Sequence, residues 1–445
     1  MHKLFPSSPF FDFETIRILG TTAYGGADVA EVLEAVGQIK PNDPTSWATA
    51  WTTQAERATR LAEEARASGH RDAARRAYLR ASNYTRASGY MYVSSRAPDG
   101  GTLAQDPRAL PAAERVGALF REAVRLNDPD AHGEMRLLPV PFEDYVLPAY
   151  LHLPPRGRRV PGGVPVLLNT GGADSCQEEL FYLNPAAGPG LGYAVLTFDG
   201  PGQGIMLRKY GLEMRPDWEA VTARVIDRLE VFARENPKLE LDLERIAVSG
   251  ASMGGYYALR AASDPRVKAC VAIDPFYDMW DFGTAHVSPL FINAWTSGWL
   301  GSGTVDRLMG IVSRLSFQMK WEISVAGTFF GLSSPSAILL NMKNYTLRGS
   351  DGDIDSGGES VSFLSRVKCP VLLSGAGKSL YLDVDNHTKR CYDALTSVAP
   401  ENKKLWIPES EGQGSLQAKM GAFALCNQRT YQFLDEVFGV VRKPL

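Results

Sequence analysis

The chain has 445 residues, of which 44% are hydrophobic and 22% are charged, and its formal net charge is −3. This composition is ordinary for a globular protein that can bury a large core. A nearly neutral charge without a basic block argues against nucleic acid or an anionic membrane surface as partner. The cysteines are scattered and none forms a CxxC pair, so we expect no zinc site and no disulfide framework: Cys176, Cys270, Cys369, Cys391 and Cys426.

Residues 1–20 mix charged side chains such as Lys3 and Arg17 among their apolar residues, which is not the pattern of a secretory signal. No run approaches the roughly 18 apolar residues of a membrane span. We therefore expect a cytoplasmic protein.

Residues 1–135 are predicted to form a helical N-terminal domain, because no strand pattern precedes residue 135. The clearest helix is Thr53–Ser68, rich in Ala, Glu and Arg and followed by Gly69, a residue that often ends a helix. A second helix is expected over Asp72–Ser88.

From residue 136 the pattern changes to short apolar runs separated by amphipathic segments such as 218–234 and 385–396. Nearly continuous apolar runs are typical of parallel strands buried on both faces, so we expect a parallel sheet with helices on both sides. The segment Val146–Leu153 contains Pro148 and is expected at the edge of the sheet. The other predicted strands are 164–168, 194–198, 246–249, 269–273, 371–374 and 404–407.

Residues 275–362 interrupt this alternation and are predicted to form an inserted helical lid. Clustered aromatic residues there predict a small core of the lid, with part of the aromatic surface facing a pocket for a bulky, apolar substrate. Asp351, Asp353 and Asp355 have the spacing of a calcium loop, but Ser356 and Ser362 replace its glycine and its closing glutamate, so we expect a solvated loop. The aromatic residues are Trp280, Phe282, Phe291, Trp295, Trp299, Phe317, Trp321, Phe329 and Phe330.

The motif Gly250-Ala251-Ser252-Met253-Gly254 matches GxSxG between a predicted strand and a predicted helix. Small residues on both sides of a serine allow the sharp turn of a nucleophile elbow. The turn would expose Ser252 Oγ and place the Met253 amide at a helix N-terminus, where it can bind an oxyanion. We therefore predict Ser252 as the catalytic nucleophile and Met253 as an oxyanion donor.

A second oxyanion donor is expected in the loop that follows residues 164–168. Thr170-Gly171-Gly172-Ala173-Asp174 has the required glycines, and we predict Gly172 or Ala173 as the donor. Asp199-Gly200-Pro201-Gly202-Gln203-Gly204 also lies at the carboxyl end of the sheet, but we interpret it as a structural turn.

A serine hydrolase needs a histidine and an acid after the serine in the chain. Only His286 and His387 follow Ser252, and the loop 409–417 before the last helix contains no histidine. Asp353, Asp383 and Asp385 remain possible acids, with His286, His387 or His132 as possible bases.

Several segments resemble the FrsA-like branch of the α/β-hydrolases: YGGADVAEVLEAVGQI, NTGGADSCQEEL, FDGPGQG and GASMGGYYALR. More closely, these segments resemble fungal hydrolases of pigment and polyketide–peptide clusters, of the yellowish-green pigment and fusarin types. The resemblance implies an α/β-hydrolase fold with a helical N-terminal domain that covers the core. From the strand pattern we predict that this core spans 136–274 and 363–445 and that the lid spans 275–362. It also implies a Ser-Asp-His triad that acts on polyketide-type carbonyl compounds in secondary metabolism.

The resemblance places the triad acid at Lys378 and the triad histidine near Gln413 or Gly414, so the triad is expected to be degenerate. Either Ser252 is activated unconventionally, for example by a buried, neutral Lys378 amine, or the protein uses its oxyanion hole without hydrolysis. The predicted function is C–C or ester hydrolysis, or ring-forming acyl transfer or condensation. A catalytically inactive protein that binds a reactive intermediate is the alternative. We expect no cofactor, no metal and a bulky apolar small-molecule substrate, and the sequence is compatible with a homodimer.

Overall fold

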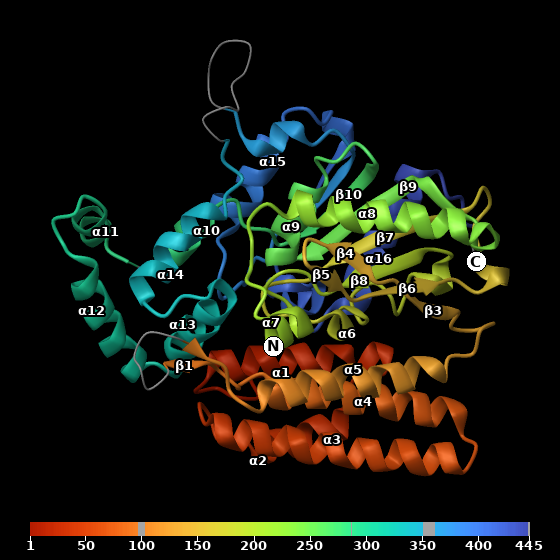
Figure 1. The fold of residues 1–445 in the computed structure, drawn as a ribbon, viewed down its shortest axis with the longest axis horizontal. Helices are drawn as coiled ribbons and strands as arrows, with labels where there is room; N and C mark the ends of the chain where they lie inside the picture. The colour runs from red at the N-terminus through yellow and green to blue at the C-terminus, as the bar shows by residue number, and fades with distance from the viewer. Residues whose placement is uncertain (97–102, 286, 350–360, 444–445) are drawn as a thin grey trace.

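The computed structural model describes residues 1–445 except 97–102, 286, 350–360 and 444–445. At its centre lies an eight-stranded sheet with the order β12-β11-β10-β9-β7-β8-β6-β3 (Figure 1). The strands are β3 (Glu134–Leu137), β6 (Ala149–Leu153), β7 (Val164–Thr170), β8 (Ala194–Phe198), β9 (Leu241–Ala251), β10 (Val267–Ile273), β11 (Val371–Ser374) and β12 (Lys403–Trp406).

The sheet is mixed, so the prediction of a wholly parallel sheet is wrong at one side. β7 to β12 run parallel, whereas β6 is antiparallel to both β8 and β3. Pro148 separates β6 from β5 (Tyr145–Leu147), which forms a hairpin with β4 (Val140–Phe142). Pro148 lies in this break, so its missing N–H does not remove a hydrogen bond from the sheet. β6 can therefore be an interior strand rather than the predicted edge strand.

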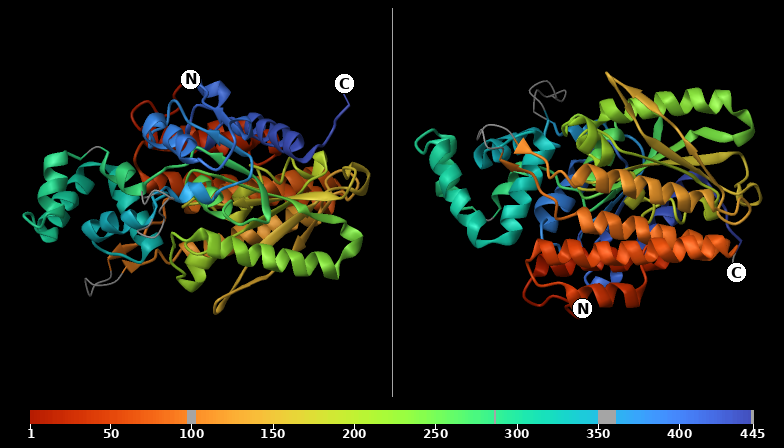
Figure 2. Two further views of the ribbon diagram at one scale, coloured as in Figure 1. Left: turned by 90° about the horizontal axis from the view of Figure 1, so that it is seen from above. Right: turned by 60° about the horizontal axis from the view of Figure 1, so that its bottom comes forward.

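Helices cover both faces of the sheet. α8 (Trp218–Glu235) and α9 (Met253–Ala261) lie on one side, and α16 (Phe423–Phe438) lies on the other (Figure 2, left). The Trp218 ring stacks on Tyr257 with centroids 3.8 Å apart, and both side chains are fully buried. Burying rings of this size contributes several kcal/mol and fixes α8 against α9.

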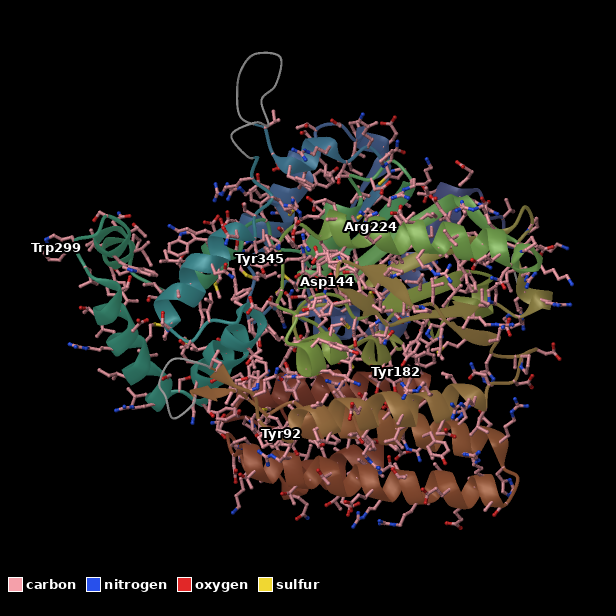
Figure 3. The ribbon with its side chains drawn as sticks, viewed as in Figure 1. Tyr92, Asp144, Tyr182, Arg224, Trp299 and Tyr345 are labelled. Carbon is pink, nitrogen blue, oxygen red and sulfur yellow. The ribbon has the colours of Figure 1, made fainter. Side chains whose placement is uncertain are left out.

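The N-terminal helices form a separate layer against the core (Figure 1). They are α1 (Pro9–Leu19), α2 (Val29–Gln38), α3 (Pro44–Ala67), α4 (Arg71–Gly89) and α5 (Ala109–Arg125). α3 is longer than the predicted Thr53–Ser68, because Asp43 caps it by accepting from the amides of Thr45 and Ser46 while Pro44 occupies the first turn. Tyr182 lies between this layer and the sheet, and its hydroxyl donates to the Leu79 carbonyl (Figure 3).

Among the described residues of 1–133 there is one strand pair, in which β1 (Ser95–Arg96) lies antiparallel to β2 (Leu103–Ala104).

No single described helix is long and apolar enough to span a membrane. A bent pair, α13 (Phe317–Phe330) with the segment Pro335–Asn344, meets the length and composition criteria together, with an angle of 62° between its halves.

The segment that was predicted as a lid contains α10 (Met279–Thr284), α11 (Pro289–Thr296), α12 (Ser302–Leu315), α13 (Phe317–Phe330) and α14 (Pro335–Asn341). Trp295, Val305 and Leu339 form a small core of its own. α13 instead packs on the N-terminal layer, where Trp321 lies 4.8 Å from the Phe10 ring. Trp299 is 85% exposed at the far end of the α11–α12 arm (Figure 3). The loop at Asp351–Asp355, which was predicted to be a solvated loop, lies outside the described residues.

Candidate active site

Ser252 lies at the turn between β9 and α9, with φ 58° and ψ −119°. This backbone conformation is unfavourable for a residue with a Cβ and marks stored strain. The Ser252 amide donates to the Ile273 carbonyl of β10 at 2.8 Å, which holds the turn at the carboxyl end of the sheet. A Cβ on Gly254 would lie 2.5 Å from the Thr170 carbonyl oxygen, so a glycine is needed for the helix to start this close to β7. The geometry is that of a nucleophile elbow.

The amides at the start of α9 are free to bind an anion. Within the part of the chain that the structure describes, neither Met253 N–H nor Gly254 N–H has an acceptor. Unpaired amides at a helix N-terminus carry a partial positive charge. The Met253 amide is thus available as the oxyanion donor that the sequence predicts.

The loop after β7 supplies two further free amides. Gln203 Nε2 donates to the carbonyls of Gly171 and Gly172 at 2.8 and 3.2 Å. In a trans peptide the N–H of the next residue points opposite to the carbonyl, so the amides of Gly172 and Ala173 point away from Gln203. Neither amide has an acceptor among the described residues. A Cβ on Gly172 would lie 3.3 Å from the Ala251 carbonyl oxygen, so this loop lies directly against the elbow.

Gln203 is a positioning residue that the sequence analysis missed. It follows β8 in the segment 199–204 that was interpreted as a plain turn, it is 1% exposed, and its Oε1 accepts from the Gly200 amide at 3.1 Å. Every polar atom of its amide therefore has a partner. Those bonds fix the orientation of the loop 170–174, which we call the oxyanion loop after its predicted role.

We predict that Gln203→Leu lowers the enzyme's turnover by about 10- to 100-fold. This decrease is smaller than the decrease expected when an oxyanion donor itself is removed. Leucine fills similar space but leaves two buried carbonyls unpaired, so the free energy of unfolding should also fall by about 1–3 kcal/mol. Steady-state kinetics and urea unfolding measure both effects. Gln413→Leu, on an exposed turn, is the control, and equal kinetics of the two variants would contradict the assignment.

No described histidine contacts Ser252 Oγ, which has no hydrogen-bond partner in the described part of the chain. His387 is buried, its Nδ1 accepts from the Tyr277 amide at 3.4 Å, and burial lowers its pKa. His132 Nδ1 accepts from the Asp128 amide. His152 lies within β6, where burial lowers its pKa to about 3.

The remaining candidates for the triad are engaged elsewhere or lie outside the described residues. Asp383 caps the helical turn 384–389 by accepting from the Asn386 amide. The exposed Asp385 pairs with Lys389. His286 and Asp353 are not among the described residues.

Lys378 does not have the buried environment that the neutral-amine hypothesis requires. Its side chain is 52% exposed, and its Nζ lies 3.1 Å from Glu411 Oε2. A hydrogen bond from the backbone amide of Glu411 and, after it, the contact with Lys378 lower the pKa of Glu411 to about 2. The Lys378 amide donates to the Ser415 carbonyl at 2.9 Å, so the two predicted loops do lie side by side. Gln413 is exposed, and Gly414 has a φ of +91°, a conformation that would strain a histidine.

A buried ion pair lies next to the elbow and was not predicted. Lys419 Nζ is 2.7 Å from Asp274 Oδ1, and the two side chains are 0% and 1% exposed. Asp274 directly follows Ile273, the acceptor of the Ser252 amide, and has a φ of +48°. Lys419 also donates to the Gly375 carbonyl. The ends of β10 and β11 are thereby tied to the loop after β12, where a triad histidine would normally lie.

The N-terminal helices reach the oxyanion loop through a second buried network. Asp174 Oδ2 accepts from Arg17 Nη1 at 2.6 Å and from the Tyr90 hydroxyl. The same hydroxyl lies 3.1 Å from Glu14 Oε1, and Arg17 pairs with Glu179. Burial raises the pKa of Glu14 to about 7, whereas Arg17 and Tyr90 hold the pKa of Asp174 below its ordinary value despite burial.

A cavity of about 430 Å³ opens beside this network. Its wall includes Ala173 and Asp174 of the oxyanion loop, Tyr90 of α4, and Trp321 and Phe329 of α13. Asp199 also lines it, and burial raises the pKa of Asp199 to about 8. The wall combines four aromatic rings with eight charged side chains, so it suits a ligand that has both apolar parts and polar groups such as carbonyls. The described residues contain no group of three or more His, Cys, Asp or Glu arranged to hold a metal.

Comparisons with known proteins agree with this architecture. Residues 166–344 match the model of the "Alpha/beta hydrolase family". The chain is 73% identical to hydrolyase ccsE of Aspergillus clavatus over the whole of both chains, and 68% identical to hydrolase pyiE of Pyricularia grisea over 100% of this chain and 99% of that protein. The chain belongs to the alpha/beta hydrolase family, and its predicted fold class is confirmed.

Solved structures resemble nearly the whole chain, and two of them cover 96% and 95% of it. The crystal structure of the 2,6-dihydroxy-pseudo-oxynicotine hydrolase superposes with a TM-score of 0.60, covering 96% of this chain and 98% of that one. The sequence identity is 20%, so this likeness shows a common fold and not a common substrate.

Proposed function

We propose that this protein closes a ring in a polyketide-type carbonyl compound of fungal secondary metabolism by an intramolecular aldol-type condensation. One observation carries the proposal: among the described residues no histidine is hydrogen-bonded to the elbow serine, which lies beside the free amides of Met253, Gly172 and Ala173. Such amides stabilise the oxygen of an enolate as well as that of a tetrahedral intermediate. Without a base, Ser252 Oγ is a hydrogen-bond donor and a weak nucleophile.

Beyond the oxyanion amides, the acceleration comes from binding a flexible substrate in one orientation. The cavity beside Ala173 holds both reacting carbonyl groups of one molecule together, and orientation of this kind is worth several orders of magnitude. The strained φ of Ser252 argues against a pure binding protein, because strain at this position serves no purpose in binding alone.

Hydrolysis is the second candidate, because close relatives carry the names hydrolase and hydrolyase. The two candidates differ in what Ser252 does. A hydrolase of this fold forms an acyl-enzyme on the serine, whereas a condensation enzyme leaves the serine unmodified.

The test uses a keto-aldehyde with a phenyl ketone and a four-methylene tether, which closes to an aryl cyclopentenyl ketone with loss of water. We expect the wild-type protein to accelerate this closure and Ser252→Ala to lose only about tenfold, the effect of one hydrogen-bond donor. p-Nitrophenyl acetate should be hydrolysed close to the buffer rate. Ser313→Ala, on α12, is the matched control.

The opposite result identifies a hydrolase. It would be rapid ester hydrolysis that Ser252→Ala abolishes, together with labelling of Ser252 by a fluorophosphonate.

A further inference from the structure

We propose that Asp174 is the general base of the carbonyl chemistry and that Tyr90 and Glu14 of the N-terminal helices position it. This inference rests on the proposed function, because a condensation needs a group that removes a proton from the carbon beside a carbonyl. A histidine performs such steps in many enzymes, but no described histidine contacts the elbow.

The position of Asp174 in the chain gives it access to a bound carbonyl. It directly follows Ala173, whose free amide is an oxyanion donor, and both residues line the same cavity. The Asp174 side chain is 30% exposed, so its carboxylate can contact a ligand. Because both residues line one cavity, a carbonyl compound bound there can contact the Ala173 amide and the Asp174 carboxylate together.

Hydrogen-bond counting shows how the network is protonated. The Tyr90 hydroxyl has one hydrogen and lies within hydrogen-bond distance of both Asp174 Oδ2 and Glu14 Oε1. If Tyr90 donates to Asp174, the contact with Glu14 is a hydrogen bond only when Glu14 is protonated and donates to Tyr90. With Glu14 neutral, the chain of donors runs from Glu14 through Tyr90 to ionised Asp174. Arg17 Nη1 also belongs to this network, because it donates to the Tyr90 oxygen at 3.2 Å and lies 3.4 Å from Glu14 Oε2.

The charges around the network support this arrangement. Arg17 and Arg86 supply two positive charges against the ionised Asp174 and Glu179, and all four side chains face the same interior region. A neutral Glu14 makes this set electrically neutral, which favours its burial. Tyr381, from the loop after β11, interacts electrostatically with Glu14, Asp174 and Arg17, and Glu322 of α13 interacts with Tyr381 in turn.

The reaction balances without a cofactor. The C–H bond beside the ketone breaks, its proton goes to Asp174, and its electron pair moves to the oxygen held by the oxyanion amides. The enolate carbon then bonds to the aldehyde carbon, and the new alkoxide takes the proton back from Asp174. In the final step Asp174 removes the second proton from the same carbon, the hydroxyl group leaves as hydroxide and takes that proton, and water is released.

Asp174→Asn tests the inference with two readouts. The first is closure of the keto-aldehyde, and the second is exchange of the benzylic protons of phenylacetone for deuterium in D₂O, followed by NMR. We expect wild-type protein to accelerate both and Asp174→Asn to lose about 10²- to 10⁴-fold in each, the usual contribution of a general base. Asp264→Asn is the matched control, because Asp264 also accepts from an arginine, Arg266, but lies in the turn between α9 and β10.

Two variants separate a positioning role from a merely structural one. Tyr90→Phe keeps the ring that packs on Trp321 and should slow exchange less than Asp174→Asn does. Wild-type kcat should fall as the pH rises through about 7, because an ionised Glu14 competes with Asp174 for the single Tyr90 hydrogen. In Glu14→Gln the amide still donates to Tyr90, so activity should persist and the inflection should disappear.

Each combination of results is decisive. Exchange without ring closure would refute the proposed function and leave Asp174 as the base. Ring closure and exchange that both survive in a folded Asp174→Asn would overturn the inference and leave the proposed function standing. Wild-type protein that accelerates neither reaction would overturn both. A Tyr90→Phe variant that folds normally keeps the test valid if Asp174→Asn is unstable, since wild-type rates and an unchanged pH profile in it would also overturn the inference.

Discussion

Replacing Lys419 by methionine should lower the free energy of unfolding by about 3–5 kcal/mol, because it leaves the Asp274 carboxylate buried without its counter-charge. Asp274 Oδ2 already has no hydrogen-bond partner, so the carboxylate has little other compensation. Methionine keeps most of the packing volume against the Trp406 ring, which the Lys419 ammonium now approaches to 4.8 Å. Urea unfolding with a check of the m-value measures the change.

A second substitution shows that the loss comes from the unpaired charge. Adding Asp274→Asn to Lys419→Met removes the charge while keeping an oxygen for the Ser374 hydroxyl, and asparagine tolerates the positive φ of this position. We expect the double variant to regain more than half of the lost stability. Lys378→Met, which breaks the exposed pair with Glu411, should leave the unfolding midpoint within experimental error. A single Lys419→Met variant as stable as the wild type would show that the pair contributes nothing.

The pattern of the sequence was sufficient to predict the parts of the fold that depend on local periodicity. The runs at 194–198 and 371–374 are strands with the predicted bounds, because strands buried on both faces must be apolar throughout. The GxSxG motif identified the elbow, since its glycines are required by close backbone contacts at Gly250 and Gly254. β3, with the sequence EMRL, is largely exposed and has no such signal.

The site residues that sequence reasoning missed depend on long-range contacts. Asp274 and Lys419 are 145 positions apart, and Glu14 meets Tyr90 across 76. Neither pair lies in a motif, so nothing local distinguishes these side chains from surface charges. Gln203 was within a noted segment, but only the fold shows that its amide faces the Gly171 and Gly172 carbonyls.

The assignment of Lys378 failed for a physical reason. A position in a loop does not define burial, and the neutral-amine hypothesis required burial. Lys378 extends into solvent towards Glu411, while Lys419 of the neighbouring loop occupies the interior. Carrying the triad positions over from the resemblance thus led to two neighbouring loops, but not to the buried Lys419 that lies next to the elbow.

Gly254→Ala should slow closure of the keto-aldehyde at least about 100-fold, because the added Cβ must displace either the elbow or the oxyanion loop from its position. The added Cβ would lie 2.5 Å from the Thr170 carbonyl oxygen and 3.0 Å from the Gly171 carbonyl carbon, and both are backbone atoms that cannot rotate away. Moving the start of α9 by about an ångström displaces the Met253 amide from the carbonyl it must stabilise, a shift that costs about two orders of magnitude in rate. Overpacking should also cost about 1–3 kcal/mol of stability.

Gly310→Ala is the matched control for this substitution. Gly310 lies within α12, where an added Cβ meets no atom within 4 Å, so alanine should stabilise the helix by about 0.5–1 kcal/mol and leave turnover unchanged. Closure of the keto-aldehyde and thermal unfolding measure both variants. Gly254→Ala with wild-type turnover would mean that the Met253 amide and the oxyanion loop do not act together on one oxygen, and the reaction would then have to depend on the cavity walls alone.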